Sequence, residues 1–394
     1  MRIDNSMKKR KKLISLTTYV LLSLSLTGCW SSVELNKLGI VVGVALDRKE
    51  KNDDIAVTTQ IGVPTLEKSN TGIGASKQYV NIKEKGKTVS QALKNISREY
   101  NRLLFFAHNQ VVIFNKELAY QGISSEIDFF LRNRETRPLT WIMVSNGEVA
   151  DIFDMNPSSR DDPGISIGKL IKNEENVSQL PIVNFKDFTM KLMSKTTSPV
   201  VPIIDLKPIE NNQKIPYIAK TAVFKKDKMV GELNESESMG FLWATNKVKY
   251  GTILVNSPAG NEKVGIRITR AKGKIRPEVK DGIIYMNISI KAEGDILEQT
   301  TSEDLANPKS FKTIEEIENT YIENQVMEAW DKAKELNADI FGFGDTLYKF
   351  KPKQWKRVED KWKEEFPKVT VKVEVDTKVR RMGKITKPAT FQGK

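Results

Sequence analysis

One long apolar run, residues 13–26, ends just before the single cysteine of the chain, Cys29. A basic segment, residues 8–12, precedes the run, and the small residues Thr27 and Gly28 follow it. A basic start, a short apolar core and a small-residue exit are typical of a secretory signal that is removed from the mature protein. The run is shorter than the roughly 20 apolar residues that a membrane-spanning helix needs. We therefore expect residues 1–28 to be a signal that takes no part in the fold.

The residues Leu26-Thr27-Gly28-Cys29 match the bacterial lipobox, in which the cysteine thiol is alkylated by diacylglycerol and cleavage leaves the cysteine first. Two other interpretations stay open here, a plain signal peptide and an uncleaved anchor, both with Cys29 incidental. Two or more acyl chains, such as palmitate, on one cysteine give stable anchoring, whereas a single chain is marginal. We expect a lipoprotein that is anchored through Cys29 outside the cytoplasmic membrane and does not span it.

Length and charge narrow the class of protein further. Removal of residues 1–28 leaves 366 of the 394 residues, which is too long for one ordinary core and predicts two or three domains. The same removal takes away six basic and one acidic side chain, so the formal net charge falls from +13 to +8. A charge of this size suits a protein beside an anionic membrane surface. No concentrated basic stripe with interleaved aromatic residues predicts nucleic-acid binding.

Two kinds of apolar pattern predict strands. Residues 40–46 are continuously apolar, which predicts a buried central strand. Further along the chain apolar and polar residues alternate at 264–268, 284–290 and 369–375, which predicts antiparallel strands with one covered face. Apolar residues at helical spacing predict a helix capped by Thr88 and a long helix from Thr313 to about Leu336.

Many of the prolines lie between residues 155 and 212, where helical pieces fit 165–172 and 185–193. We interpret residues 155–212 as a Pro-rich helical connector or second small domain. It would separate an N-terminal α+β domain at 29–154 from a C-terminal α+β domain at 213–394. Both halves mix strands with helices and include antiparallel pairing. The expected fold class is therefore α+β, multi-domain, with mixed and antiparallel sheets packed with helices.

The chain has a single histidine, His108, and any Ser-His-Asp or Cys-His site would have to use it. No nucleophile-elbow glycines lie near it, so we interpret His108 as a partly buried residue bonded to backbone at a strand end. One histidine and no free cysteine exclude the usual zinc sets, which need several such ligands. We expect no metal and no cofactor.

Three further motifs also lack a catalytic interpretation. Gly342-Phe343-Gly344-Asp345 resembles half of a dinucleotide fingerprint, but it follows a helix and lacks the third glycine. The pairs Asp161-Asp162 and Glu174-Glu175 are adjacent carboxylates in expected polar loops, and neighbouring side chains point apart on a helix or strand. We interpret them as solvated charges and expect a protein that is not an enzyme.

Three blocks of residues, in order along the chain, carry a resemblance to a known family. The first is 26–30 with 34–38 and 40–47, the second is 106–113 with 128–132 and Arg137, and the third is 221–231 with 237–243. Together they resemble the spore germinant-receptor C subunits, the Ger(x)C lipoproteins of endospore-forming bacteria. Ser31-Ser32 departs from the pattern, in which charged residues are common after the Cys-Trp pair.

The resemblance implies a place in a spore germinant receptor, on the outer face of the spore inner membrane. Its partners would be an A-type and a B-type polytopic subunit, besides the membrane lipid held through acylated Cys29. The implied fold is three mixed α/β domains. The implied role is support of nutrient-triggered germination by docking to these partners, with no nucleic acid involved. Neither the nutrient nor a nutrient site follows from the residues.

A second function stays in view, a solute-binding lipoprotein that delivers a small nutrient to a membrane transporter. Two doubly wound lobes with parallel crossovers would be its usual signature. The alternating strands at 264–268, 284–290 and 369–375 point instead to a lipid-anchored interaction subunit.

Overall fold

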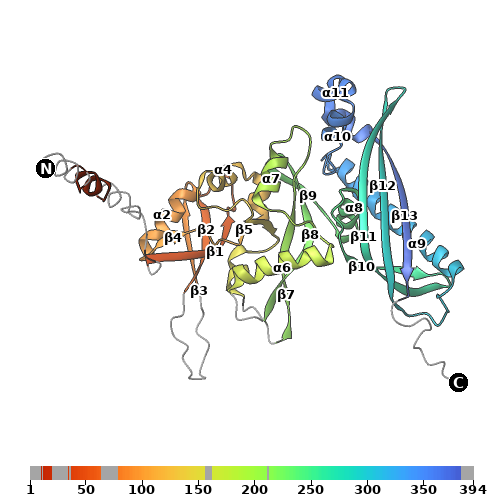
Figure 1. Cartoon of the computed structure of the whole chain (residues 1–394), viewed down its shortest axis with the longest axis horizontal. Helices are drawn as coiled ribbons and strands as arrows, with labels where there is room; N and C mark the ends of the chain where they lie inside the picture. The colour runs from red at the N-terminus through yellow and green to blue at the C-terminus, as the bar shows by residue number, and fades with distance from the viewer. Residues whose placement is uncertain are drawn as a thin grey trace, which may run out of the picture.

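The computed structural model describes residues 10, 12–19, 34, 37–63, 79–155, 162–210 and 213–382. Cys29 and the other lipobox residues lie outside these ranges. Two sheets lie side by side along the long axis of the molecule, each with its own helices (Figure 1). We call the first sheet with helices α2–α7 the N-terminal unit, and the second sheet with α8–α12 the C-terminal unit. The chain therefore has the expected α+β, multi-domain fold with mixed sheets.

The first sheet has a parallel centre and antiparallel wings. Its order is β3-β2-β1-β5-β6-β7-β8-β9, with β4 paired beside the start of β1. The central strands β1, β5, β6 and β7 are parallel, whereas β2–β3 and β8–β9 add antiparallel pairs. The strands are β1 (Leu38–Asp47), β2 (Ile55–Gly62), β3 (Tyr79–Gly86), β4 (Leu103–Phe105), β5 (Val111–Asn115), β6 (Trp141–Ser145), β7 (Val200–Pro208), β8 (Lys214–Lys225) and β9 (Lys228–Leu233).

Helices cover both faces of this sheet. One face packs against α2 (Val89–Glu99), α3 (Lys116–Gln121), α4 (Ser124–Arg132) and α7 (Phe185–Leu192), and the other against α5 (Val149–Asp154) and α6 (Pro163–Val177). Val44 of β1 belongs to the first of these cores and its neighbour Ala45 to the second. A strand that is buried on both faces needs a continuous apolar run, so the prediction for residues 40–46 is confirmed.

The second sheet has the order β10-β11-β12-β13, with a very long β11–β12 hairpin. Its strands are β10 (Gly251–Ser257), β11 (Gly260–Lys280), β12 (Ile283–Gln299) and β13 (Thr370–Arg381). Strand β13 pairs with β12 in parallel, so the antiparallel prediction for 369–375 is wrong. Alternation of apolar and polar residues indicates that one face of a strand is covered. It does not indicate whether the neighbouring strand runs parallel or antiparallel. The chain reaches β13 by a crossover through α9–α12, which makes the pair parallel.

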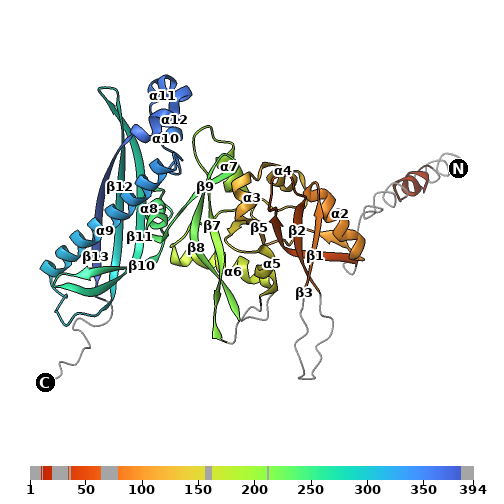
Figure 2. The ribbon, with the colours of Figure 1, turned by 180° about the vertical axis from the view of Figure 1, so that it is seen from behind.

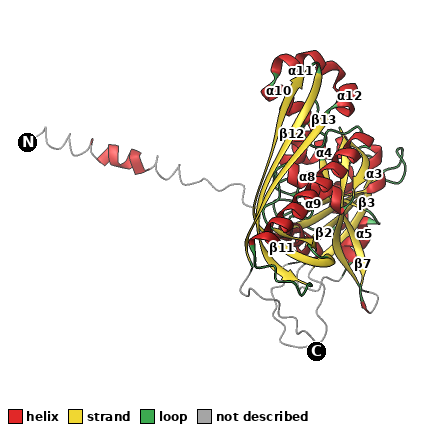
Figure 3. Cartoon of the chain, turned by 90° about the vertical axis from the view of Figure 1, so that its right-hand side faces the viewer, coloured by secondary structure: helices red, strands yellow, loops and turns green. Residues whose placement is uncertain are grey.

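All helices of the C-terminal unit lie on one face of its sheet, and the other face is open (Figures 2 and 3). They are α8 (Glu235–Ala244), α9 (Pro308–Glu335), α10 (Phe343–Phe350), α11 (Pro352–Val358) and α12 (Trp362–Glu365). Helix α9 begins at Pro308, five residues before the predicted start, because the side chain of Asn307 accepts the Ser310 N–H and proline fits a first turn. Gly240 lets α8 approach α9 closely, and Trp243 Nε1 donates to Gln325 Oε1 at 3.1 Å.

The first sheet continues through the predicted connector and beyond it. Strand β7 lies within residues 155–212, and β8 and β9 lie within the predicted C-terminal domain, yet all three pair in the first sheet. We expected only helical pieces and a connector there, because prolines are rare inside strands. Pro202 nevertheless lies in β7, opposite Thr221 of β8. The borders 29–154, 155–212 and 213–394 stay predictions.

Candidate functional site

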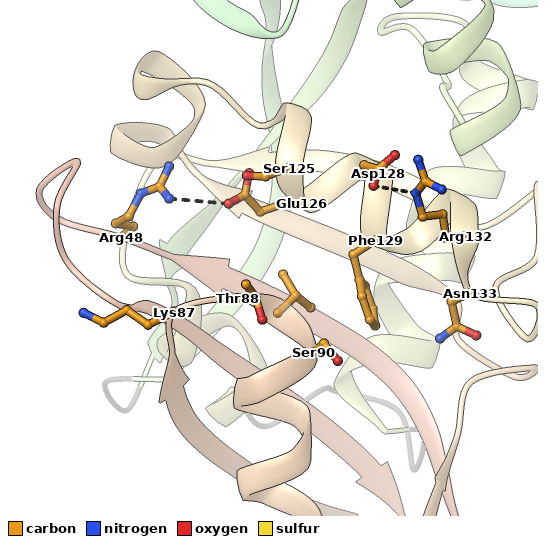
Figure 4. Close-up of a pocket in the computed structure, with 11 residues that line it drawn as sticks. Arg48, Lys87, Thr88, Ser90, Ser125, Glu126, Asp128, Phe129, Arg132 and Asn133 are labelled. Atoms are coloured by element: carbon orange, nitrogen blue, oxygen red, sulfur yellow. Dashed lines mark hydrogen bonds and ion pairs between the residues drawn. The ribbon is translucent and has the colours of Figure 1, made fainter.

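A cleft of about 530 Å³ opens between the amino end of α2 and the length of α4 in the N-terminal unit (Figure 4). Helix α2 begins there because Thr88 Oγ1 accepts the backbone N–H of Gln91 at 3.2 Å. Helix α4 begins after Ile123, which offers no side-chain cap. Helix amino ends carry unpaired N–H groups and partial positive charge. The amino end of α2 therefore faces the opening, whereas α4 borders it from its first turn to its C-cap Asn133. The apolar side chains of Val89 and Phe129 also line it.

An ion pair closes the inner end of this cleft. Arg48 follows β1, and its Nε donates to Gln121 Oε1 at 3.1 Å while its Nη1 lies 3.5 Å from Glu126 Oε1. Glu126 is only 3% exposed, and its Oε2 has no hydrogen-bond partner among the described residues. The pair ties the end of β1 to α3 and α4, so Arg48 has a structural role even when the cleft is empty.

The other charges of the cleft are also paired. Lys87 Nζ lies 2.6 Å from Asp54 Oδ1, and Arg132 Nε donates to Asp128 Oδ2 at 2.7 Å. The hydrogen bond from the Arg132 guanidinium lowers the pKa of the exposed Asp128 carboxyl. The hydroxyls of the cleft have no histidine near them, since His108 is not part of its lining. The arrangement suits contact with a small polar group.

His108 lies in the turn between β4 and β5, and its side chain is exposed. Its ring centroid is 6.0 Å from that of Phe105. The prediction of a partly buried histidine is therefore wrong, and the buried polar residue of this turn is its neighbour Asn109, only 3% exposed. The backbone oxygen of His108 accepts the side-chain amide of Gln110 at 2.9 Å, which holds the turn without the imidazole.

The two carboxylate pairs have separate outcomes. Asp161 lies outside the described residues. Asp162, the N-cap residue of α6, is only 9% exposed and lies against Gly62 of β2, so its interpretation as a solvated charge is wrong. Glu175 is exposed, as expected for a solvated charge. Glu174 is half-buried, and burial raises its pKa although the backbone N–H groups of Gln179 and Leu180 bond to it. It closes the turn after α6, so its interpretation as a solvated charge is wrong.

The segment Gly342-Phe343-Gly344-Asp345 joins the two units. Asp345 accepts hydrogen bonds from the hydroxyls of Ser194, Thr196 and Thr197 at 2.6 to 3.1 Å, and these residues link α7 to β7. The preceding Asp339 is fully buried and accepts the N–H groups of Phe343 and Gly344 at 2.8 Å each. Desolvation raises the pKa of Asp339 to about 6, despite these bonds.

Sequence reasoning missed this junction, because its partners lie about 150 positions apart along the chain. A local signal was present, since Asp345 follows a glycine turn and lies in the first turn of α10, with Gly342 at φ 71° as its N-cap. Among the described residues no helix is both long and apolar enough to cross a membrane. The candidate lipid site, Cys29, lies outside the described ranges.

Comparison with known proteins gives consistent matches over nearly the whole chain. The profile of the family described as "Spore germination protein N-terminal domain" matches residues 31–206, and that described as "Spore germination B3/ GerAC like, C-terminal" matches residues 219–383. The chain is 27% identical to spore germination protein KC of Bacillus subtilis (strain 168), covering 94% of this chain and 95% of that protein. It is 26% identical to spore germination protein YndF of the same strain, covering 96% and 98%.

A solved structure shares the fold. The crystal structure of the GerBC protein superposes with a TM-score of 0.57 at 18% sequence identity, covering 86% of this chain and 96% of that one. The shared region spans both sheets, so the arrangement of two units belongs to the fold.

Proposed function

Because the chain belongs to the GerAC-like family of spore germination proteins, we propose that it is the lipid-anchored C subunit of a nutrient-germinant receptor. The observation that carries the proposal is the match of two family profiles, in order, to residues 31–206 and 219–383. The named relatives are spore germination proteins over nearly their full lengths. A role in germination is therefore well supported, and the receptor, its subunits and the anchor are the proposed part.

The anchor is proposed at Cys29, two residues before the first matched position. The lipobox residues that precede it support acylation, and acylation would hold the protein on the outer face of the spore inner membrane. Confinement to one surface raises the effective concentration of the protein for neighbouring membrane proteins. Weak docking contacts on A-type and B-type polytopic subunits then suffice for a stable complex.

The proposed mode of action is binding to the other receptor subunits and not catalysis. The cleft between α2 and α4 holds paired charges, and the exposed His108 lies outside it. Hydrogen bonds to Asp345 link the segment between α7 and β7 to α10, and in this proposal that link couples the two units when either one is contacted. Interfaces of this kind usually depend on a few buried residues.

The test is a deletion of the gene in its own spore-forming host. We expect loss of the response to one class of nutrient, while spores still germinate through other triggers. Wild-type protein should restore the response, and Cys29→Ala should restore it poorly because the chain leaves the membrane. Fatty-acid labelling of both proteins is the control, and equal labelling would refute the anchor. An unchanged response to every nutrient would refute the receptor role.

The cleft favours one alternative, a solute-binding lipoprotein that delivers a nutrient to a transporter. Its volume of about 530 Å³ lies within the range of ligand pockets. A ligand that binds the native state raises its stability. A thermal-shift screen with germinant nutrients therefore separates the two functions: a rise in Tm that Arg48→Ala abolishes would favour solute binding, and no shift favours the docking subunit.

A further inference from the structure

The open face of the second sheet carries a large excess of positive charge. We define the open face as the side chains of β11, β12 and β13 that point away from α8 and α9. With Lys263 and Glu298 included, it holds eleven basic side chains, all of them exposed, against six acidic ones, of which four are half-buried. Strand β11 alone contributes Arg267, Arg270, Lys272, Lys274, Arg276 and Lys280. The outermost layer of this face is therefore positive.

Ion pairs involve most of the acidic residues of this face, whereas some of its lysines have no ion pair among the described residues. Glu293 lies within 4.0 Å of both Arg270 and Arg380, and Asp376 lies 3.7 Å from Lys291. The ammonium groups of Lys272 and Lys274 have no acidic partner within 4.0 Å among the described residues. A third lysine, Lys372, lies over the ring of Tyr285 at 4.7 Å. These three ammonium groups remain available to an outside anion.

Helix α9, on the opposite side of the sheet, has an acidic carboxyl-terminal half. Helix α9 exposes Glu316, Glu323, Glu328, Asp331 and Glu335. Its lysines near the end, Lys332 and Lys334, pair with Glu335 and Asp331 at 2.8 and 2.9 Å. The charge therefore differs between the sheet and α9, although α10–α12 also expose Lys353, Lys356 and Arg357. A positive sheet face is attracted to a negatively charged plane.

The shape of the open face fits a phosphate-bearing surface. A hollow of about 450 Å³ lies across the three strands. Five basic side chains line it together with two acidic ones: Arg270, Lys272, Lys291, Lys378 and Arg380, with Glu293 and Asp376. Lys378 also pairs with Glu315 of α9 at 3.3 Å, at the edge of the face. Around this hollow the described residues show no exposed large apolar side chain. Protein interfaces usually have an apolar or aromatic centre. The absence of such a centre here favours a lipid surface over an acidic protein as the occupant.

We propose that the open face docks on an anionic lipid bilayer and lays the C-terminal unit against the membrane. The inference rests on the proposed membrane location for its setting, and it adds a second, electrostatic contact to the lipid anchor. One lipid anchor leaves a body of this length free to turn. A positive face on the same body fixes which side meets the bilayer and which side, α9 included, stays free for partners.

The test uses the full chain bound to vesicles and a water-soluble acetylating reagent, with each lysine followed by mass spectrometry. On phosphatidylglycerol vesicles at low salt we expect Lys272, Lys274 and Lys372 to lose reactivity relative to phosphatidylcholine vesicles. The exposed Lys94, Lys186 and Lys312 on other surfaces serve as internal controls and should react equally on both. Higher salt should restore labelling on the anionic vesicles, because it screens exposed charges.

Charge reversal supplies the matched variants. In the triple variant K272E/K274E/K372E, Lys291 and Lys378 should become reactive toward the acetylating reagent on anionic vesicles. Each lysine near an anionic surface contributes about fivefold to vesicle affinity, so the three together contribute about 100-fold. The variant K94E/K186E/K312E changes the net charge equally and should keep both protected. Equal labelling of the open-face lysines on the two lipids would overturn the inference. Protection that occurs only in native spore membranes would also overturn it, because the occupant would then be a protein. Attachment to phosphatidylcholine vesicles reports the anchor separately.

Discussion

Gly240→Ala should destabilise the C-terminal unit, although alanine is the better helix former. Gly240 lies in α8 where that helix meets α9. A Cβ at this position would lie 1.9 Å from the backbone oxygen of Gln325 and 2.8 Å from the nitrogen of Val326. Both atoms are backbone atoms inside a helix, so no side chain can rotate away. The substitution therefore forces α8 and α9 apart.

The magnitude follows from two opposing effects. Overpacking of a close contact costs about 3 kcal/mol at the upper end of its usual range, and rigid backbone neighbours place this site there. Replacement of glycine by alanine within a helix stabilises by about 1 kcal/mol. The net loss is about 2 kcal/mol, which lowers the Tm of a unit of this size by about 4 to 8 °C.

Tryptophan fluorescence during heating is a suitable assay, because Trp243, Trp330, Trp355 and Trp362 all lie in the C-terminal unit. The matched control is Gly147→Ala, since a Cβ there meets nothing within 4 Å. We expect the control to keep its Tm. An unchanged or raised Tm for the variant in α8 would refute the close contact between α8 and α9.

Three further outcomes are expected. Glu318 is buried beside Thr377, and burial raises its pKa to about 7, so its contribution to stability should be largest below about pH 4.5 and fall as pH rises toward 7. Glu318→Gln should flatten that part of the stability–pH curve, and an unaltered curve would contradict this expectation. His108→Gln should change Tm by less than about 2 °C and preserve germination, since the ring is exposed; loss of germination at normal Tm would reveal a functional histidine. Asp345→Ala should speed hydrogen exchange at the Thr197 N–H by freeing the junction, and unchanged exchange would show that other contacts hold it.

The local patterns of the sequence predicted the elements that depend on local physics. The run at 40–46 became a strand buried on both faces, and Thr88 caps α2 as its position before Val89 and Ala92 indicated. The predicted antiparallel direction of β13 was wrong, because strand direction depends on the connection through α9–α12. The alternation of Val371 and its neighbours carries no information on that connection.

Features that depend on distant residues could not be predicted. Strand β7 contains Pro202, and only its pairing with β6 and β8 holds that proline in a sheet. The hydroxyls of Thr196 and Thr197 meet Asp345 across the junction, so the glycine turn before Asp345 was visible in the sequence but its partners were not. The charge of the open face became visible only when the registers of three strands placed Lys272 beside Lys291.

The central claim is that this protein works as a docking subunit among membrane proteins. Purification of a tagged chain from dormant-spore membranes, with quantitative mass spectrometry of what accompanies it, tests this claim most directly. The account predicts two polytopic receptor subunits in amounts comparable to the tagged chain, with neither recovered on an equally abundant, unrelated spore lipoprotein. Recovery of the tagged chain alone, from membranes whose nutrient response is intact, would contradict it.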